Sequence, residues 1–298
     1  MKKILLTGIN GQVGHALQKK LVHHQVVALN REQLDLSDAD AIRRTVQAIR
    51  PNLIINPAAY TAVDKAESEQ DLAYAINAIA PQILAEEAAK INAALIHFST
   101  DYVYDGTKTR DYVETDDVNP LSTYGKSKLA GEAAIQAVGL PHLILRTSWV
   151  YGAYGKNFLK TIIRLASERD NLRIVADQFG APTSSESIAD AVLALLTAWQ
   201  PQNRHQTGIY HLSNQGKTSW HGFSCEIVRE YNRLTKSIGR APLKTSVEAV
   251  AAITTADYPT PAARPANSTL INHKLNQTFS VSLPSWEQGL QQVLQSIE

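Results

Sequence analysis

The chain has 298 residues, with 29 basic and 28 acidic side chains and a net charge of +1. This balance excludes a general attraction to nucleic acids or anionic membranes, so an anionic ligand needs a local site. The single cysteine, Cys225, excludes internal disulfides and a cysteine metal cluster, and we expect a cytoplasmic protein without a bound metal. No apolar stretch approaches the ~20 residues of a membrane-spanning helix.

Short apolar runs alternate with helical segments through the first half of the chain. The expected strands are Ile4–Leu6, Val26–Leu29, Leu53–Ile55, Leu95–Phe98 and Leu143–Leu145. The periodicity of apolar residues predicts helices over Gln12–His23, Ala39–Arg50, Gln70–Lys90 and Ser122–Ala137. This alternation predicts an α/β fold of the Rossmann type, a doubly wound parallel sheet with helices on both faces.

The pattern changes after Val150. The expected elements are helices at Asn157–Glu168, Ser187–Trp199, Trp220–Thr235 and Ser285–Ser296, and strands at Arg173–Val175 and Tyr210–Leu212. We expect residues 1–150 to form a dinucleotide-binding domain to which 171–199 returns. Residues 151–170 and 200–298 would form a smaller, mixed α/β substrate lobe that faces the carboxyl ends of the strands.

Three glycines follow the first expected strand and overlap the start of a helix. Glycine permits a tight turn and brings backbone amides and the helix N-terminus against a diphosphate. The segment therefore predicts a dinucleotide site made of Gly8, Asn10, Gly11, Gln12, Val13 and Gly14. A plain strand-to-helix turn is the alternative, and the place of the motif at the N-terminus, with a second strand soon after it, disfavours that alternative.

The second expected strand ends in Leu29-Asn30-Arg31, without the acidic residue that usually reaches the ribose hydroxyls of NAD. Arg31 can pair with a 2′-phosphate, which favours NADPH and leaves NADH as an alternative donor. A solvated arginine at a strand end is the competing interpretation. We expect Asn30 and Arg31 to contact the cofactor, and Asp35 and Leu36 to lie beside its adenine.

Tyr124 and Lys128 are four residues apart in an expected helix, so their side chains share one face. A phenol titrates near pKa ~10, and a neighbouring ammonium favours the phenolate and lowers that pKa. Tyr104 and Lys108 have the same spacing, but Asp105-Gly106 between them is a turn signal. Spacing alone leaves a surface helix pair as the alternative to an acid–base site.

Thr100 lies at the end of the fourth expected strand, at the edge where such sheets bind ligands. We expect Tyr124 to point to the same edge. The Thr100 hydroxyl can then bond the carbonyl oxygen that Tyr124 protonates, so that two donors face the oxygen where charge develops. A cap of the strand end is the alternative role for Thr100.

These segments resemble the extended short-chain dehydrogenase/reductases and, among them, the dTDP-4-dehydrorhamnose reductase family. The resemblance runs almost end to end and is most specific in Ser99-Thr-Asp-Tyr-Val103, Arg146-Thr-Ser-Trp149 and Arg264-Pro-Ala-Asn-Ser268. It implies a catalytic set of Thr100, Tyr124 and Lys128, cofactor contacts at Ala58, Ala59 and Tyr60, and sugar contacts at Thr100, Asp101, Tyr102 and Trp149. Asn77 lies where extended members often have a helix asparagine, and we assign it no catalytic role.

The resemblance implies an oxidoreductase of dTDP-rhamnose synthesis that uses NADPH to reduce the C4 keto group of dTDP-4-dehydro-L-rhamnose. Similar 4,6-dehydratases typically carry a glutamate after the Thr-Asp pair, where this chain has Tyr102, so simple reduction is favoured. Two alternatives stay open: a reductase of another 4-keto-6-deoxy sugar nucleotide, and a non-catalytic NADP-binding regulatory subunit. The expected partner is a sugar nucleotide, with no nucleic acid and no membrane, and a homodimer is left open.

Overall fold

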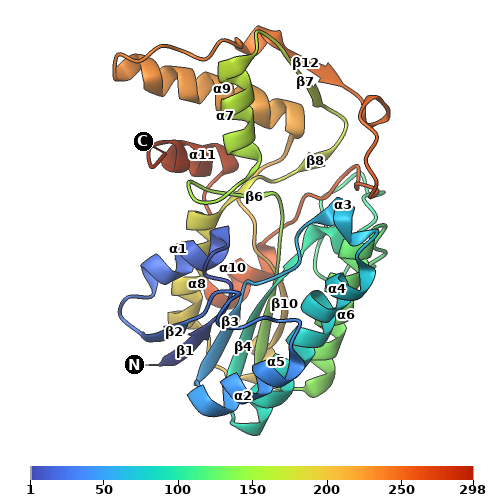
Figure 1. Cartoon of the computed structure of the whole chain (residues 1–298), viewed down its shortest axis with the longest axis vertical. Helices are drawn as coiled ribbons and strands as arrows, with labels where there is room; N and C mark the ends of the chain where they lie inside the picture. Colours follow the sequence, from blue (N-terminus) through green and yellow to red (C-terminus); the bar gives the residue numbers. More distant parts are fainter. Residues whose placement is uncertain (1, 298) are drawn as a thin grey trace.

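The computed structural model describes residues 2–297, which form a larger part built on a sheet and a smaller part above it (Figure 1). The strands of the sheet are β1 (Lys3–Leu6), β2 (Gln25–Ala28), β3 (Leu53–Asn56), β4 (Ala94–Thr100), β5 (His142–Thr147) and β10 (Gly208–His211). They are all parallel, in the order β2-β1-β3-β4-β5-β10. The predicted doubly wound α/β fold is confirmed.

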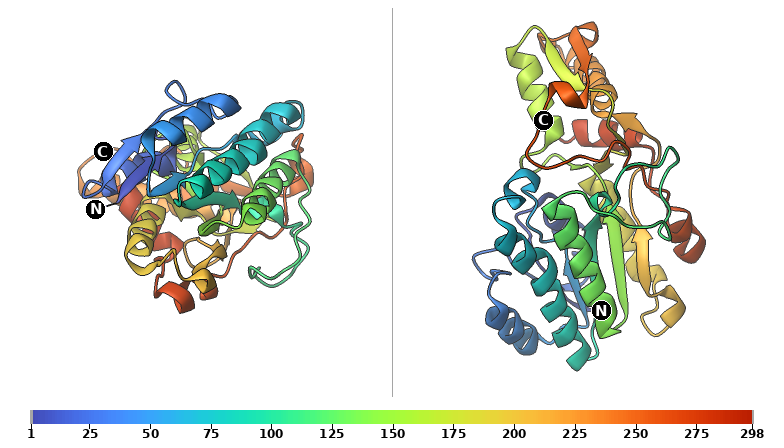
Figure 2. Two further views of the ribbon diagram at one scale, coloured as in Figure 1. Left: turned by 90° about the horizontal axis from the view of Figure 1, so that it is seen from below. Right: turned by 90° about the vertical axis from the view of Figure 1, so that its right-hand side faces the viewer.

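Helices cover both faces of this sheet (Figure 2). One face packs against α1 (Gln12–Lys20), α8 (Ser185–Ala198) and α10 (His273–Phe279), and the other against α2 (Ala39–Ile49), α5 (Ala80–Lys90) and α6 (Thr123–Val138). Strand β1 shows why both faces are covered. Ile4 and Leu6 pack in the core with α1, α8 and α10, and Leu5 packs in the core with α2, α5 and α6. Side chains alternate between the faces of a strand, so continuous apolar runs need cover on both sides.

The expected helix over 70–90 contains one π-helical turn. It consists of α4 (Gln70–Tyr74), the π turn Ala75–Ile79 and α5, and α3 (Val63–Ala66) precedes it. A π turn inserts an extra residue into a helix and often occurs near functional sites. Asn77 lies in this turn, where its side chain accepts from Tyr60 N (2.8 Å) and donates to Tyr60 O (3.1 Å) and Ser127 Oγ (3.0 Å). Asn77 thus ties the segment after β3 to α6.

The smaller part has its own apolar core. Its elements are α7 (Phe158–Glu168), α9 (Trp220–Ser237), α11 (Trp286–Leu294) and the parallel pair β7 (Leu172–Val175) and β12 (Val250–Ile253). Two short pairs complete the strands: β6 (Val150–Tyr151) with β9 (Thr183–Ser184), and β8 (Phe179–Gly180) with β11 (Thr218–Ser219). Short 3₁₀ turns occupy Asp101–Val103, Arg204–Gln206, Val247–Ala249 and Thr255–Asp257.

The chain is divided between the two parts differently from the division we expected. Strand β7 pairs with β12 in the smaller part, so of the segment 171–199 only the region of α8 returns to the large sheet. Strand β10 pairs with β5, and Leu275 and Phe279 of α10 lie in the large core, so these residues do not belong to the substrate lobe. Isolated four-residue strands carry no local signal of which strand they will pair with.

Among residues 2–297, no helix combines the length and apolar character that crossing a membrane requires.

Candidate active site

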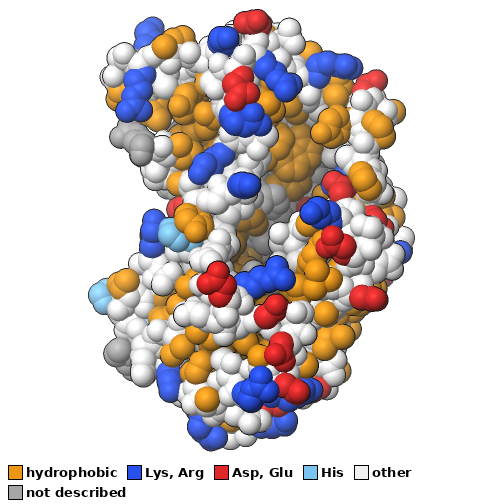
Figure 3. Space-filling view, in the orientation of Figure 1, with side chains coloured by type: hydrophobic (Ala, Val, Ile, Leu, Met, Phe, Trp, Pro, Cys, Tyr) orange, Lys and Arg blue, Asp and Glu red, His pale blue; other side chains and the backbone are white. Residues whose placement is uncertain are grey.

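A cavity of about 580 Å³ opens at the carboxyl ends of the central strands, where the surface is hollowed between the two parts (Figure 3). It brings together most of the residues predicted from the sequence. These are Gly8, Asn10, Gly11, Gln12, Val13, Gly14, Arg31, Asp35, Leu36, Ala58, Ala59, Tyr60, Tyr124 and Lys128. Asn30, Thr100, Asp101, Tyr102 and Trp149 do not line this cavity.

The glycine loop has a geometry that other residues could not adopt. Gly8 has φ +62°, and a Cβ on it would lie 2.8 Å from the Cβ of Ala58. A Cβ on Gly14 would lie 2.2 Å from the carbonyl oxygen of Gly8. Helix α1 then begins without a side-chain cap at Gly11 and without an acidic residue in its first turn. Its N-terminal amides therefore suit an anionic group such as a diphosphate.

The residues after β2 lie at the far end of the same cavity. The Arg31 side chain is 73% exposed and forms a long ion pair with Asp35, with its Nε 3.9 Å from Asp35 Oδ2. Hydrogen bonds from the backbone and hydroxyl of Ser37 lower the pKa of Asp35. Asn30 has a local role instead, because its Oδ1 accepts from Gln33 N (3.0 Å) and shapes the turn.

Helix α6 is held firmly at the end that carries Tyr124. The Ser122 side chain accepts from Gly125 N (3.2 Å), and Glu67 accepts from Thr123 N (2.9 Å) and from the Thr123 hydroxyl (3.0 Å). A carboxylate at a helix N-terminus is favoured by the partial positive charge there. These contacts fix the first turn of the helix, and with it the direction of the Tyr124 side chain.

Thr100 and Asp101 follow directly from β4. The Thr100 hydroxyl donates to Asp101 Oδ1 (3.0 Å) and accepts from Tyr102 N (3.2 Å), so the cap that we considered for Thr100 is present. Asp101 is only 2% exposed, and its Oδ2 has no hydrogen-bond partner among residues 2–297. Burial raises the pKa of Asp101 to about 7. Buried polar atoms usually have a hydrogen-bond partner, so this oxygen is an exception.

The rings of Tyr102 and Tyr124 meet edge to face, with centroids 5.6 Å apart and an interplanar angle of 76°. The guanidinium of Arg264 lies 5.9 Å from the ring centre of Tyr102 and pairs with both carboxylate oxygens of Asp64 at 2.9 Å. The C-terminal segment around Arg264 is therefore anchored beside Tyr102 and Tyr124.

Tyr124 and Lys128 lie on one face of α6, but the ammonium does not lower the pKa of the phenol as we expected. Burial raises the pKa of Tyr124 to about 12 and lowers that of Lys128 to about 8. Lys128 is 1% exposed, donates from Nζ to Phe98 O (2.6 Å) and lies 3.2 Å from His97 Nε2. The ammonium is thus directed toward β4, and burial dominates at Tyr124.

Trp149 packs within the protein. Its indole stacks on Trp220 at 3.5 Å with an interplanar angle of 5°, and a Cβ on Gly180 would lie 2.5 Å from its Cε2. Its backbone φ is +47°, a conformation that is strained in a residue other than glycine and that clusters at active sites. Trp149 thus has a packing role in the structure, and its sugar contact stays a prediction.

The segment 153–157 was not predicted as part of the site, although Gly155 and Lys156 line the cavity. Asn157 Nδ2 donates to Gln12 Oε1 (2.9 Å), and the Tyr154 ring stacks on His15 with centroids 3.8 Å apart. These contacts hold a lysine of the smaller part next to the start of α1. A lysine in a loop has no distinctive pattern, so only its folded position identifies it. Residues 2–297 contain no group of His, Cys, Asp and Glu arranged to hold a metal ion.

Comparisons with known proteins identify the family to which the chain belongs. A dTDP-4-dehydrorhamnose reductase of Burkholderia thailandensis is 46% identical over 288 residues, 95% of each chain. The solved dTDP-4-dehydrorhamnose reductase of Clostridium acetobutylicum is 38% identical, with a TM-score of 0.88 and 99% of each chain covered. That of Bacillus anthracis, in complex with NADP, is 35% identical with the same TM-score and coverage. The family model described as the RmlD substrate binding domain matches residues 1–298, so the chain belongs to this family.

Proposed function

We propose that the chain catalyses the NADPH-dependent reduction of the C4 keto group of dTDP-4-dehydro-L-rhamnose to dTDP-L-rhamnose. One observation carries the proposal: Tyr124 and Lys128 line the same cavity as the glycine loop, in a chain 46% identical to a dTDP-4-dehydrorhamnose reductase. A dinucleotide held by that loop would extend toward an acid–base pair on α6. This is the arrangement that reduction of a carbonyl requires.

The residues present fit NADPH. The uncapped start of α1 and the glycine loop suit its diphosphate, and Arg31 suits its 2′-phosphate. Lys156 adds a further cation at the cavity, next to Gly155, which also lines it. The Bacillus anthracis relative in complex with NADP supports this choice. When bound, NADPH supplies the hydride.

Tyr124 is the proton donor of the proposed reaction. A phenol whose pKa is about 12 stays protonated near neutral pH, as an acid that protonates the C4 oxygen must. The Thr100 hydroxyl, whose one proton goes to Asp101 Oδ1 in the structure, would turn to donate it to the same oxygen, and the Lys128 ammonium would stabilise the phenolate that Tyr124 becomes. The unpartnered Oδ2 of Asp101 would accept a hydrogen bond from a sugar hydroxyl.

Tyr102 supports reduction over dehydration. Burial raises the pKa of Tyr102 well above its ordinary value, so its phenol does not ionise near neutral pH and cannot replace the carboxylate that helps a dehydratase to eliminate water. Another 4-keto-6-deoxy sugar nucleotide is the alternative substrate.

A panel experiment tests the proposal and separates its alternatives. The protein is incubated with NADPH and a series of 4-keto-6-deoxy sugar nucleotides, and loss of NADPH is followed by absorbance. We expect the largest kcat/KM with dTDP-4-dehydro-L-rhamnose. A larger value with another sugar nucleotide would change the substrate. NADPH binding without turnover of any substrate would favour the regulatory subunit.

A second measurement tests the choice of cofactor. We expect a larger kcat/KM with NADPH than with NADH, and Arg31→Ala should remove most of the difference, because the 2′-phosphate loses its guanidinium partner. A clear preference of the unmodified protein for NADH would refute the role of Arg31. A cytoplasmic location and a homodimer stay predictions.

A further inference from the structure

A buried row of polar side chains runs behind the catalytic helix. Lys128 Nζ lies 3.2 Å from His97 Nε2, and His97 Nδ1 lies 3.1 Å from the Asn56 amide. The other end of that amide lies 2.6 Å from the Thr7 hydroxyl. The four side chains come from α6, β4, β3 and the end of β1, and each is at most 2% exposed. The reaction proposed above gives His97 no role.

While Lys128 is charged, the hydrogen-bond donors and acceptors of the row determine where its protons lie. An ammonium has only donors, so the His97 nitrogen that faces it must be a bare acceptor, and the imidazole must be neutral. Burial, and then the positive charge of Lys128, hold the pKa of His97 well below its ordinary value. The single imidazole proton therefore lies on Nδ1, toward Asn56.

In the structure Asn56 Nδ2 faces His97 Nδ1, but the two ends of an amide have the same shape, so the amide can turn and accept that proton. The Asn56 oxygen faces His97 after a half-turn of the amide, and its NH₂ group then faces the Thr7 hydroxyl, which both donates and accepts. Asn56 and His97 are directly paired on neighbouring parallel strands, so the backbone fixes their separation. The sheet thus positions the middle of the row, and helix α6 supplies Lys128 at one end.

Lys128 has few other partners for its charge. Glu132 lies one turn further along α6, but both of its carboxylate oxygens are bonded by Arg146 of β5, at 2.9 and 2.6 Å. Tyr124, one turn before Lys128, is a neutral phenol near neutral pH. Within residues 2–297, the acceptors in hydrogen-bond range of the ammonium are therefore Phe98 O and His97 Nε2.

We propose that His97 is a positioning residue, whose neutral Nε2 accepts a hydrogen bond from the Lys128 ammonium and holds it in place for Tyr124. The inference rests on the proposed function for its kinetic consequence, though not for its geometry. An apolar side chain at position 97 would leave the ammonium with one acceptor in a buried site. Losing a hydrogen bond to the charged form disfavours that form and lowers the pKa of Lys128.

Two substitutions at His97 separate positioning from packing. His97→Leu removes the acceptor, whereas His97→Gln can place an amide oxygen where Nε2 stood. We expect the alkaline limb of kcat/KM for the reduction to move to lower pH by about one unit in His97→Leu and to return in His97→Gln. Because His97 does not line the cavity, NADPH binding followed by fluorescence should change little in either variant.

His142 supplies a matched control, since it is also a buried histidine but bonds Leu140 O from its Nδ1 (2.9 Å). His142→Leu should leave the alkaline limb where it is in the unmodified protein. The proposal is overturned if His97→Leu loses activity without moving the limb, or if His97→Gln is as impaired as His97→Leu.

A spectroscopic measurement tests the geometry independently of activity. In protein labelled with ¹⁵N histidine, the resonances that disappear in His97→Gln should report a neutral ring protonated on Nδ1, unchanged between about pH 5 and 8. Protonation on Nε2 in that range, or titration near an ordinary histidine pKa, would refute the role of His97. If the substrate panel fails while this signature is present, the proposed function falls and the hydrogen bond stands.

Discussion

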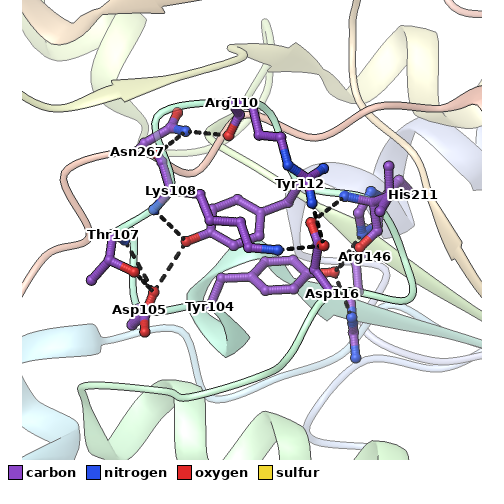
Figure 4. A network of polar contacts seen from close by, with 11 residues as sticks. Tyr104, Asp105, Thr107, Lys108, Arg110, Tyr112, Asp116, Arg146, His211 and Asn267 are labelled. Atoms are coloured by element: carbon purple, nitrogen blue, oxygen red, sulfur yellow. Dashed lines mark hydrogen bonds and ion pairs between the residues drawn. The ribbon is translucent and has the colours of Figure 1, made fainter.

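Two regions of the molecule contain a tyrosine followed four residues later by a lysine, and they use this pair differently. Tyr124 and Lys128 share one face of α6 and line the cavity. Tyr104 and Lys108 lie beyond the 3₁₀ turn Asp101–Val103, in a loop, and the Tyr104 hydroxyl and the Lys108 ammonium bind different polar partners (Figure 4). A tyrosine and a lysine four residues apart therefore share one face only where the segment between them is helical.

The partners of the Tyr104 region are internal. The Tyr104 hydroxyl lies 2.7 Å from Arg146 Nη1 and 2.8 Å from His211 Nε2. Lys108 lies over the Tyr112 ring, 5.6 Å from its centre, and forms an ion pair with Asp116. In this region the polar side chains find their hydrogen-bond and ion-pair partners within the protein.

The carboxylates of the two regions show the same contrast. Asp105 accepts from the backbone (3.0 Å) and hydroxyl (2.8 Å) of Thr107, and these bonds lower its pKa to about 2. Asp101, four residues earlier, has an oxygen without a partner, and burial raises its pKa to about 7. A buried oxygen without a hydrogen-bond partner and a raised carboxyl pKa are typical of groups that bind a ligand.

The largest expected effect is the difference in kcat between substitutions of the two tyrosines. Tyr124→Phe should lower kcat by about 10²–10⁴-fold, because the reaction loses its proton donor. NADPH binding, measured by fluorescence, should persist. Tyr104→Phe is the matched control and should keep kcat within a few fold. Near-normal turnover by Tyr124→Phe would remove the catalytic assignment.

The buried ion pair of Arg146 and Glu132, beside Tyr104, should contribute more to stability than an exposed ion pair. Arg146→Met leaves the Glu132 carboxylate buried without its partner, and we expect the free energy of unfolding in urea to fall by about 3–5 kcal/mol. Arg164 forms an exposed pair with Glu168, and Arg164→Met should change the same quantity by less than about 1 kcal/mol. Equal effects of the two substitutions would contradict the buried role of Arg146.

The two aspartates should affect the pH dependence of stability in opposite directions. The pKa of Asp101 is raised to about 7, so its stabilising contribution is complete below its unfolded pKa of about 4 and is lost as the pH rises through about 7. The pKa of Asp105 is lowered to about 2, so its contribution is complete above about 4 and is lost as the pH falls toward about 2.

Urea unfolding at a series of pH values checks both aspartates. Relative to the unmodified protein, Asp101→Asn should become more stable as the pH rises from about 4 to 7, because it lacks the titrating group. Asp105→Asn should show no such gain over that range, and its difference should arise below about pH 4. Parallel curves for Asp101→Asn and the unmodified protein would mean that Asp101 titrates normally.

The smallest expected effect concerns the cofactor end of the cavity. Lys156→Ala should raise the Kd for NADPH by about three- to tenfold, because one exposed cation near the diphosphate contributes about a kcal/mol. The effect should weaken at high salt. Lys126 is exposed on α6 and does not line the cavity, so Lys126→Ala supplies the control. Unchanged affinity of Lys156→Ala would remove Lys156 from the site.

Much of the fold was predictable because its signals are local. The apolar runs of β1 and β3–β5, the glycine turn before α1 and the cap and periodicity of α6 each depend on residues a few positions apart. These signals placed Gly8–Gly14, Tyr124 and Lys128 at the end of a parallel sheet, and the structure brings them to one cavity.

The tertiary structure alone decided the environment of those residues. Lys128 meets His97 across 31 positions, and Asn157 brings Lys156 to the cavity through a contact with Gln12 across 145 positions. The same holds for β10, whose partner β5 is remote in sequence, and for the pKa of Tyr124, which burial raises against our expectation. Backbone geometry follows from near neighbours, whereas burial, pairing and pKa depend on groups that only the folded chain brings together.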